Sequence, residues 1–205
     1  MKIGLITCCD RNYEPVANIT FPLNQRYCES QGYVFDFRYF EQKDSWAETV
    51  WMKISLLKGL MFPGGYDWMM WIDADAMVMN HRVKIEELIE KCSPEANVII
   101  SSDLHGLNAG VFLIRNCLWS KVFLSAVEDK KDEYLSHKYP EQEAMDSVIS
   151  EIGNKERVAF LPQWLLNQFW LQWIPGDFII HHSGGSVEDK VKGLTPFLSK
   201  VEFAR

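Results

Sequence analysis

Short apolar runs and helical apolar stripes alternate along this chain. Uninterrupted apolar runs predict buried strands at 2–7, 68–72 and 178–180, and further strands are predicted at 33–40, 97–101 and 111–115. The run at 68–72, WMMWI, has no polar position, as expected for a central strand covered on both faces. Strands that alternate with helices predict an α/β fold with a mostly parallel central sheet flanked by helices.

The helical stripes have recognisable ends. One helix is predicted over 24–31, ended by Gly32, and a second over 50–61, ended by the Pro-Gly-Gly at 63–65. Further helices are predicted over 83–92 and 118–126, and another begins at Pro140, with its core stripe running from Ala144 to Ile152. From Gly184 onward the chain is polar and contains glycine, which predicts a mobile lid.

Composition narrows the class of protein. Hydrophobic residues make up 47% and charged residues 24%, which is typical of a folded chain, and the length predicts one domain over 1–205. A net charge of −7 argues against nucleic-acid binding. The five cysteines show no paired spacing, and no apolar run is long enough for a signal peptide or a membrane span, so we expect a reduced, cytoplasmic protein.

The strongest chemical signal is a pair of aspartates. Asp73 and Asp75 directly follow the strand at 68–72, at the end of a sheet where α/β folds place their ligands. Two carboxylates held close together repel unless a cation or proton lies between them, and their oxygens suit Mg²⁺ or Mn²⁺. A solvated surface turn is the alternative interpretation of this D-x-D sequence.

Three other groups of residues are candidates for the same site. His181 ends the late strand and would favour Mn²⁺, although His182 beside it leaves the choice open. Lys53 lies inside an apolar helical arc, where it either binds a diphosphate or extends its amine to water. Aromatic and polar residues near 163–173 either form a sugar platform or belong to the core: Trp164, Trp170, Trp173, Gln163 and Asn167.

Several segments together resemble the family 34 glycosyltransferases. They are WMKISLLKGL, YDWMMWIDADAMVMN, LNAGVFLIRNCLWS, PEQEA, ERVAFLPQWLLN and GDFIIHHSGG, spread over about 1–185. That family includes fungal α-1,2-galactosyltransferases, mannan-polymerase subunits and plant xyloglucan xylosyltransferases. The resemblance implies the GT-A fold, a nucleotide-sugar donor and transfer with retention of the anomeric configuration.

The resemblance also implies roles for individual residues. It makes Asp73 and Asp75 the D-x-D metal ligands, with Ala74 between them at the donor, and it makes His181 and Gly184 the histidine and glycine of the family's H-x-x-G sequence. The segment Asn108, Ala109 and Gly110 would line the donor sugar. Gln142 would lie near the anomeric carbon, with Glu141 beside it, although plant relatives carry two acidic residues before this glutamine and this chain has Pro140 and Glu141.

The resulting hypothesis is a Mn²⁺-dependent transferase, with Mg²⁺ as the alternative ion. It would move a hexosyl or pentosyl group from a nucleotide-sugar, expected to be UDP-linked, to a glycan or other hydroxyl acceptor. Two other functions stay open at this point. A phosphatase of the haloacid-dehalogenase type would use Asp73 as its nucleophile, and a non-catalytic protein on the same scaffold would bind nucleotide-sugars or glycans without turnover.

Overall fold

Two β-sheets of unequal size organise the chain, seen in a computed structural model that describes residues 1–151 and 155–204. The six-stranded sheet has the order β2-β1-β3-β6-β5-β7, and the three-stranded sheet has the order β4-β9-β8. The larger sheet comprises β1 (Ile3–Cys9), β2 (Val34–Tyr39), β3 (Trp68–Ile72), β5 (Val98–Asp103), β6 (Gly106–Arg115) and β7 (Val158–Phe160). The smaller sheet comprises β4 (Ala76–Val78), β8 (Gln168–Phe169) and β9 (Ile179–His181).

The large sheet is mostly parallel, with one reversed strand. Strand β1 runs parallel to β2 and β3, and β5 runs parallel to β7. Strand β6 is antiparallel to both of its neighbours, β3 and β5. It begins at Gly106, five residues before the predicted start at 111, because its first half still pairs with β5, across a register shift between Ile99 and Ser101.

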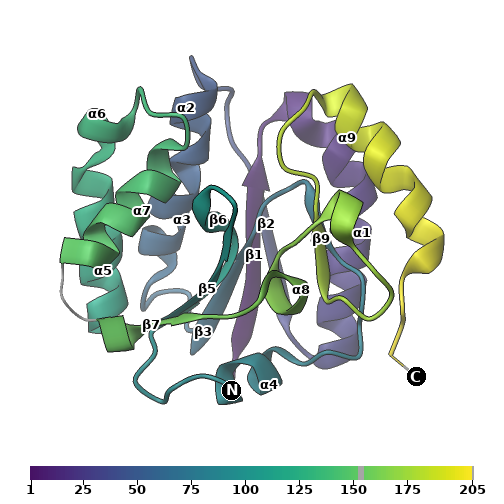
Figure 1. The fold of residues 1–205 in the computed structure, drawn as a ribbon, viewed down its shortest axis with the longest axis horizontal. Coiled ribbons are helices and arrows are strands. Elements are labelled where there is room, and N and C mark those ends of the chain that lie inside the picture. The colour runs from purple at the N-terminus through teal and green to yellow at the C-terminus, as the bar shows by residue number, and fades with distance from the viewer. Residues whose placement is uncertain (152–154, 205) are drawn as a thin grey trace.

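Helices cover both faces of the large sheet (Figure 1). On one face lie α3 (Met52–Leu60), α5 (Leu118–Asp129) and α7 (Pro140–Glu151), and on the other lie α1 (Glu14–Gln31) and α9 (Val187–Leu194). In β3, Met69 and Trp71 pack into the hydrophobic core on one face of the sheet, whereas Met70 and Ile72 pack into the core on the other face. The predicted burial of this strand on both faces is therefore confirmed.

The helix predicted over 24–31 starts ten residues earlier, at Glu14, and contains Pro22. Proline removes one backbone hydrogen bond from a helix. Seven buried residues outweigh that loss by packing α1 against the rest of the chain: Val16, Ala17, Thr20, Phe21, Asn24, Tyr27 and Cys28. The predicted end is confirmed, because Gly32 follows with a left-handed φ of 73°.

The remaining helices depart from the predictions mainly at their ends. The helix predicted over 50–61 corresponds to α3, and the short helix α2 (Trp46–Val50) precedes it; the one predicted over 83–92 is shorter, α4 (Ile85–Glu90). Helix α7 begins at Pro140 as predicted, and Ile152 lies outside the described residues. Two short helices are α6 (Lys131–Tyr134) and α8 (Gln163–Leu166). The first three 3-10 helices are η1 (Arg11–Tyr13), η2 (Lys155–Arg157) and η3 (Trp170–Gln172).

The prediction of a mobile lid after Gly184 is wrong for most of that segment. Ser186 and Asp189 form a reciprocal capping box that starts α9, and the 3-10 helix η4 (Thr195–Lys200) follows it. Helix α9 packs beside α1 (Figure 1). Across residues 1–151 and 155–204, no helix combines the length and apolar character that a bilayer crossing needs.

Candidate active site

A cavity of about 570 Å³ opens at the carboxyl ends of β1 and β3. Its wall includes Cys8 and Cys9 from the end of β1, Asp73 to Asp75 from the end of β3, and the loop 183–185 before α9. The reversed strand β6 adds Asn108 and Gly110 to the same wall, because its first half runs beside the end of β3. The volume suits a small-molecule ligand.

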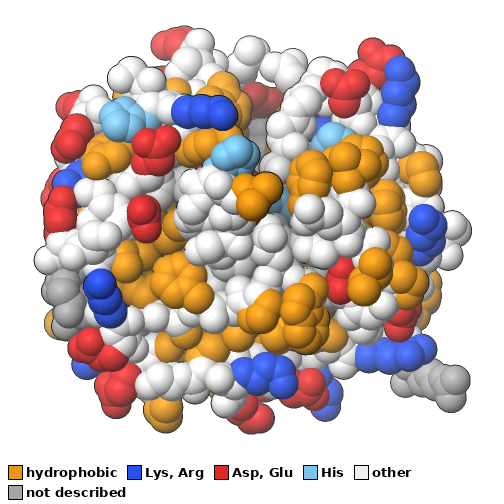
Figure 2. Space-filling view, in the orientation of Figure 1, with side chains coloured by type: hydrophobic (Ala, Val, Ile, Leu, Met, Phe, Trp, Pro, Cys, Tyr) orange, Lys and Arg blue, Asp and Glu red, His pale blue; other side chains and the backbone are white. Residues whose placement is uncertain are grey.

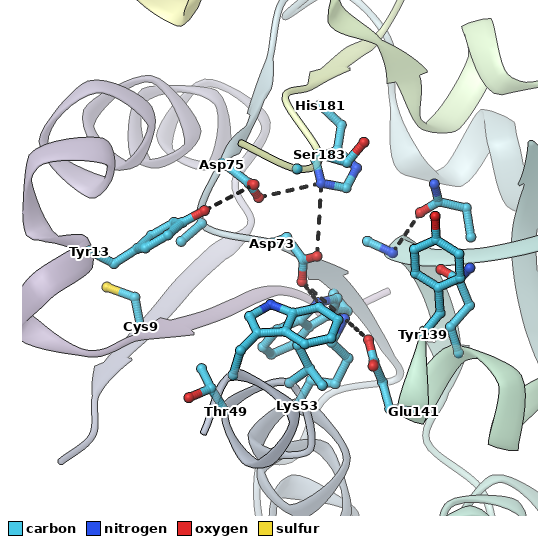
Figure 3. Close-up of a pocket in the computed structure, with 18 of the residues that line it drawn as sticks. Cys9, Tyr13, Thr49, Lys53, Asp73, Asp75, Tyr139, Glu141, His181 and Ser183 are labelled. Atoms are coloured by element: carbon cyan, nitrogen blue, oxygen red, sulfur yellow. Dashed lines mark hydrogen bonds and ion pairs between the residues drawn. The ribbon is translucent and has the colours of Figure 1, made fainter. Parts of the chain in front are cut away.

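Asp73 is held by bonds from three elements. Its backbone N–H donates to the carbonyl of Gly110 (2.8 Å), which joins the end of β3 to β6. Its Oδ1 accepts from the indole of Trp71 (2.7 Å) and lies 3.1 Å from the Nζ of Lys53. One carboxylate oxygen is thereby committed to the protein, and the other, Oδ2, faces His181 (Figure 3).

The two carboxylate oxygens of Asp75 also have different partners. Its Oδ2 accepts from the hydroxyl of Tyr13 (3.0 Å) and from the Nζ of Lys190 (2.5 Å). Its Oδ1 lies 3.4 Å from the Nε2 of His181. Asp75 is 6% exposed, so these partners replace the water that a buried carboxylate would otherwise need.

His181 completes a cluster of three possible metal ligands. Strand β9 delivers it, with His181 opposite Ala76 in the register with β4. Its Nε2 is 3.4 Å from Asp75 Oδ1 and 3.9 Å from Asp73 Oδ2, and the ligand atoms of the three residues all lie within 4.8 Å of one another. A cation about 2.1 Å from each ligand places adjacent ligands about 3 Å apart and opposite ones about 4.2 Å apart. The cluster therefore fits a divalent ion.

His182 is directed away from the aspartates. Its ring stacks on Trp170, with centroids 4.4 Å apart and planes 8° apart, and its carbonyl accepts from Lys190 (2.6 Å). Burial lowers its pKa below the usual value. Of the two adjacent histidines, only His181 joins the carboxylate cluster within the described chain.

The two aspartates have opposite electrostatic environments. Burial raises the pKa of Asp73, and Asp75 adds to the rise against the opposing influence of Lys53. Burial would also raise the pKa of Asp75, but His181 and Lys190 outweigh it and hold this pKa below its ordinary value. Asp75 is therefore the carboxylate that stays ionised most readily when no cation is bound.

The amine of Lys53 points into the interior and does not reach water. It is 3% exposed, lies 2.9 Å from Glu141 Oε1 and 3.1 Å from Asp73 Oδ1, and donates to the carbonyl of Ala109 (3.1 Å). Burial alone would lower the pKa of Lys53, but Asp73 and Glu141 outweigh it and raise the pKa. Lys53 thus links α3, α7, β6 and the end of β3 at the floor of the cavity.

Gln142 and the segment Asn108 to Gly110 form one side of the cavity. Gln142 Oε1 accepts from the backbone N–H of Ala109 (3.0 Å), which leaves its Nε2 as the group that can donate to a ligand. Asn108, Gly110 and Gln142 line the cavity, whereas Ala109 lies behind them with both backbone groups bonded. Ala74 and Gly184 also line the cavity.

The residues predicted near 163–173 are scattered. Gln163 lies in α8, outside the cavity lining, and Asn167 is buried against His181 and Asn108. Trp170 and Trp173 are half-buried and pack against Phe197, whereas Trp164 is 52% exposed. Figure 2 shows exposed hydrophobic side chains, in orange, on the face of the molecule that is turned to the viewer in Figure 1. The three tryptophans therefore do not form one platform.

The site also contains groups that the sequence did not predict, among them Tyr13, Asp103 and Lys190. Lys190 had a readable signal, because it shares a helical face with Val187, Val191 and Leu194, as Lys53 does in its own helix. Tyr13 follows a turn, and Asp103 ends a strand. The hydrophobic and polar pattern around neither residue indicates a functional role. Tertiary packing alone brings these two side chains to the cavity.

Comparison with solved structures defines the class of fold. A glycosyltransferase involved in glycosylation of the major capsid of PBCV-1 matches with a TM-score of 0.81 and 16% identity over 95% of this chain and 100% of that chain. The galactosyltransferase LgtC, solved with donor and acceptor sugar analogues, matches with a TM-score of 0.62 and 12% identity over 98% and 97%. The fold is the GT-A glycosyltransferase fold.

The family follows from the sequence. The model of the galactosyl transferase GMA12/MNN10 family matches residues 9–94 and 89–192, and the chain belongs to this family. The probable alpha-1,6-mannosyltransferase MNN10 of Saccharomyces cerevisiae is 23% identical over 75% of this chain and 48% of its own length. Glycosyltransferase 6 of Arabidopsis thaliana is 35% identical over 63% and 36%. The chain thus spans about half the length of such relatives.

Proposed function

We propose that the protein transfers a glycosyl group from a nucleoside diphosphate sugar, UDP-linked, to a hydroxyl group of a glycan or similar acceptor. The observation that carries this proposal is the cluster of Asp73, Asp75 and His181 on the wall of a cavity in a GT-A fold. Membership of a family of galactosyl transferases supports the same reaction class.

The same three residues would hold a divalent cation. Two carboxylate oxygens and one imidazole favour Mn²⁺ over Mg²⁺, because imidazole is a poor ligand for the harder ion. When bound, the cation would counter the negative charge that grows on the departing diphosphate. Tyr13 and Lys190 keep Asp75 Oδ2 occupied, so that Oδ1 is the oxygen directed at the cation.

Gln142 is the residue that we place beside the reacting sugar carbon. Its Oε1 is fixed by the N–H of Ala109, so its Nε2 is presented to the cavity. Glu141 is 6% exposed and paired with Lys53, which makes it a charge partner in the floor of the site. We therefore favour retention by entry of the acceptor on the face that the leaving group vacates, with Gln142 donating a hydrogen bond there and no covalent intermediate on Glu141.

Binding of Mn²⁺ and UDP-sugars tests the proposal. We expect the protein to bind Mn²⁺ in electron paramagnetic resonance titrations and to hydrolyse or transfer one of UDP-galactose, UDP-xylose or UDP-glucose, whereas turnover of GDP-mannose alone would contradict a UDP-linked donor. Asp75→Asn should weaken Mn²⁺ binding by more than the roughly 10- to 100-fold that is typical when a residue that only contacts a metal ligand is replaced. Asp177→Asn is the matched control, because Asp177 is also buried but bonds the backbone of Ile174.

The alternatives predict different results in the same assays. Donor binding without turnover across an acceptor array would identify a binding protein. Release of phosphate from phosphomonoesters, with covalent labelling of Asp73, would identify a phosphatase. Neither result is expected, because Asp73 Oδ1 is already engaged by Trp71 and Lys53 and the chain belongs to a transferase family.

A further inference from the structure

We infer that Asn167 is a positioning residue, which fixes the ring of His181 with hydrogen on Nδ1 and so leaves Nε2 as the ligand atom. Asn167 is 2% exposed and His181 is 5% exposed, so water does not compete for the contact between them. The consequence for metal binding rests on the proposed function. The position of the hydrogen does not, because it follows from hydrogen bonds within the protein.

Two hydrogen bonds determine which side-chain amide atom of Asn108 is the oxygen and which is the nitrogen. The backbone N–H of Gly110 can only donate, and it donates to Asn108 Oδ1 (2.9 Å). At its other end, Asn108 Nδ2 donates to the carboxylate of Asp103 (2.6 Å), which accepts. These two contacts agree, and exchanging the amide oxygen and nitrogen of Asn108 would lose both of them.

Asn108 in turn determines the orientation of Asn167. Since the atom of Asn108 that faces Asn167 is the oxygen Oδ1, the atom of Asn167 at 2.7 Å must be the donor Nδ2. The amide oxygen of Asn167 then lies 3.0 Å from His181 Nδ1. An oxygen acceptor at this distance requires hydrogen on Nδ1, whether the imidazole is neutral or protonated.

The remaining ring nitrogen is therefore the one that faces the aspartates. Nε2 of His181 lies 3.4 Å from Asp75 Oδ1 and 3.9 Å from Asp73 Oδ2. In the neutral ring it offers a lone pair, which a cation can share with two carboxylate oxygens. The opposite tautomer would present hydrogen on Nε2 to these carboxylates and leave no lone pair there for a cation. Asn167 selects against that competing arrangement.

This chain of contacts also joins two parts of the cavity wall. Asn108 and Asp103 line the cavity, whereas Asn167 lies behind it. A residue of the wall thus holds the buried asparagine that orients the histidine. Gly110 contributes at the same point, because a Cβ there would overlap the His181 ring.

The experiment measures the tautomer in the metal-free protein. Long-range ¹H–¹⁵N spectra of the ¹⁵N-histidine-labelled chain, at a pH where the imidazole is neutral, should show hydrogen on Nδ1 of His181. Asn167→Leu, which removes both amide bonds, should move hydrogen to Nε2, where the aspartates accept it. Mn²⁺ affinity should fall roughly 10- to 100-fold, measured by paramagnetic resonance.

Two further variants separate positioning from general stability. Asn167→Asp keeps an oxygen for His181 and loses the donor to Asn108, so it should retain hydrogen on Nδ1 even if Asn167→Leu fails to fold. Asn116→Leu is the matched control, because Asn116 also bridges two groups, Phe62 N–H and the Tyr66 carbonyl, beyond the far end of β6. It should leave the tautomer and the Mn²⁺ affinity unchanged.

The possible outcomes distinguish this inference from the proposed function. Hydrogen on Nε2 in the unmodified protein, or an unchanged tautomer in Asn167→Leu, overturns the inference whatever the metal does. Failure of the unmodified protein to bind Mn²⁺, with hydrogen on Nδ1, would instead contradict the proposed metal site and leave the role of Asn167 in orienting His181 supported.

Discussion

At the scale of single residues, His81 is a buried imidazole that does not line the cavity. It is 1% exposed and lies edge-on between the rings of Tyr27 and Phe203. Neither ring nitrogen has a hydrogen-bond partner among residues 1–151 and 155–204. Burial lowers the pKa of His81 to about 4, because the charged ring would lose its water and the nearby backbone of Val78 does not offset that loss.

This burial makes stability depend on pH. Between about pH 6.5 and pH 4 the unfolded chain binds a proton at His81 and the folded chain does not, so acid favours unfolding. The free energy of unfolding should fall by about 1.4 kcal/mol per pH unit, and by roughly 3 kcal/mol in all. His81→Phe should remove most of this slope, measured by urea unfolding across that range.

His137→Gln provides the control for the pH series. His137 has a side chain that is 42% exposed and pairs with Glu143, so its replacement should leave the slope near that of the unmodified protein. A His81→Phe variant with the full slope would show that other groups bind the protons.

Residue chemistry at the site was only partly predictable from the sequence. Asp73 and Asp75 were found because a buried strand ends directly before them, and Lys53 because it interrupts an apolar helical stripe. Lys190 carries the same signal and was hidden by the polar, glycine-containing context, which suggested a loop. The partners of these residues come from segments far away in the chain, and no local pattern encodes that proximity.

At the scale of elements, the reversed strand β6 shapes the site. Because β6 runs antiparallel to β3, its early residues lie where β3 ends, and Gly110 comes to lie under His181. A Cβ at position 110 would be 2.7 Å from His181 Nδ1, which is closer than real Cβ atoms approach. The backbone of a central strand cannot move aside, so the histidine would have to move.

Gly110→Ala should therefore damage the proposed metal site more than the fold. We expect Mn²⁺ affinity to fall about 10-fold or more and the free energy of unfolding to fall by about 1–3 kcal/mol. Gly59→Ala is the control, because position 59 is exposed in α3 with no atom within 4 Å of the added carbon. It should stabilise the protein by up to about 1 kcal/mol. Equal Mn²⁺ affinity in both variants would show that His181 does not depend on the space at Gly110.

Element boundaries were predictable where one local feature determines them. Gly32 ends α1, and Pro140 starts α7, because each residue's own backbone preference decides the matter. The start of α1 and the length of β6 depend on partners elsewhere in the chain, whereas α9 begins at a local capping box, Ser186 and Asp189, that the glycine-containing context obscures. Packing supplies enough stability to carry α1 through Pro22, and pairing with β5 extends β6 back to Gly106.

At the scale of the whole molecule, the chain carries a net negative charge, and the cavity wall is also more negative than positive. The net charge is −7. The ionisable side chains in the cavity wall include five carboxylates and two lysines, at Asp10, Asp73, Asp75, Asp103, Glu141, Lys53 and Lys190. An anionic diphosphate would be repelled by such a wall unless a cation came with it. The charge balance therefore favours ordered binding, with the metal ion before or together with the donor.

Thermal unfolding tests this dependence on the cation. A ligand at 100 times its dissociation constant stabilises the folded state by about 2.7 kcal/mol, which corresponds to a rise in Tm of roughly 5–10 °C for a chain of this size. We expect Mn²⁺ to produce such a rise, UDP with Mn²⁺ to add to it, and UDP with a chelator to produce almost none. Asp75→Asn should abolish the Mn²⁺ effect. A rise with UDP and chelator equal to that with UDP and Mn²⁺ would show that Lys53 and Lys190 suffice to bind the diphosphate, and would contradict the requirement for a cation.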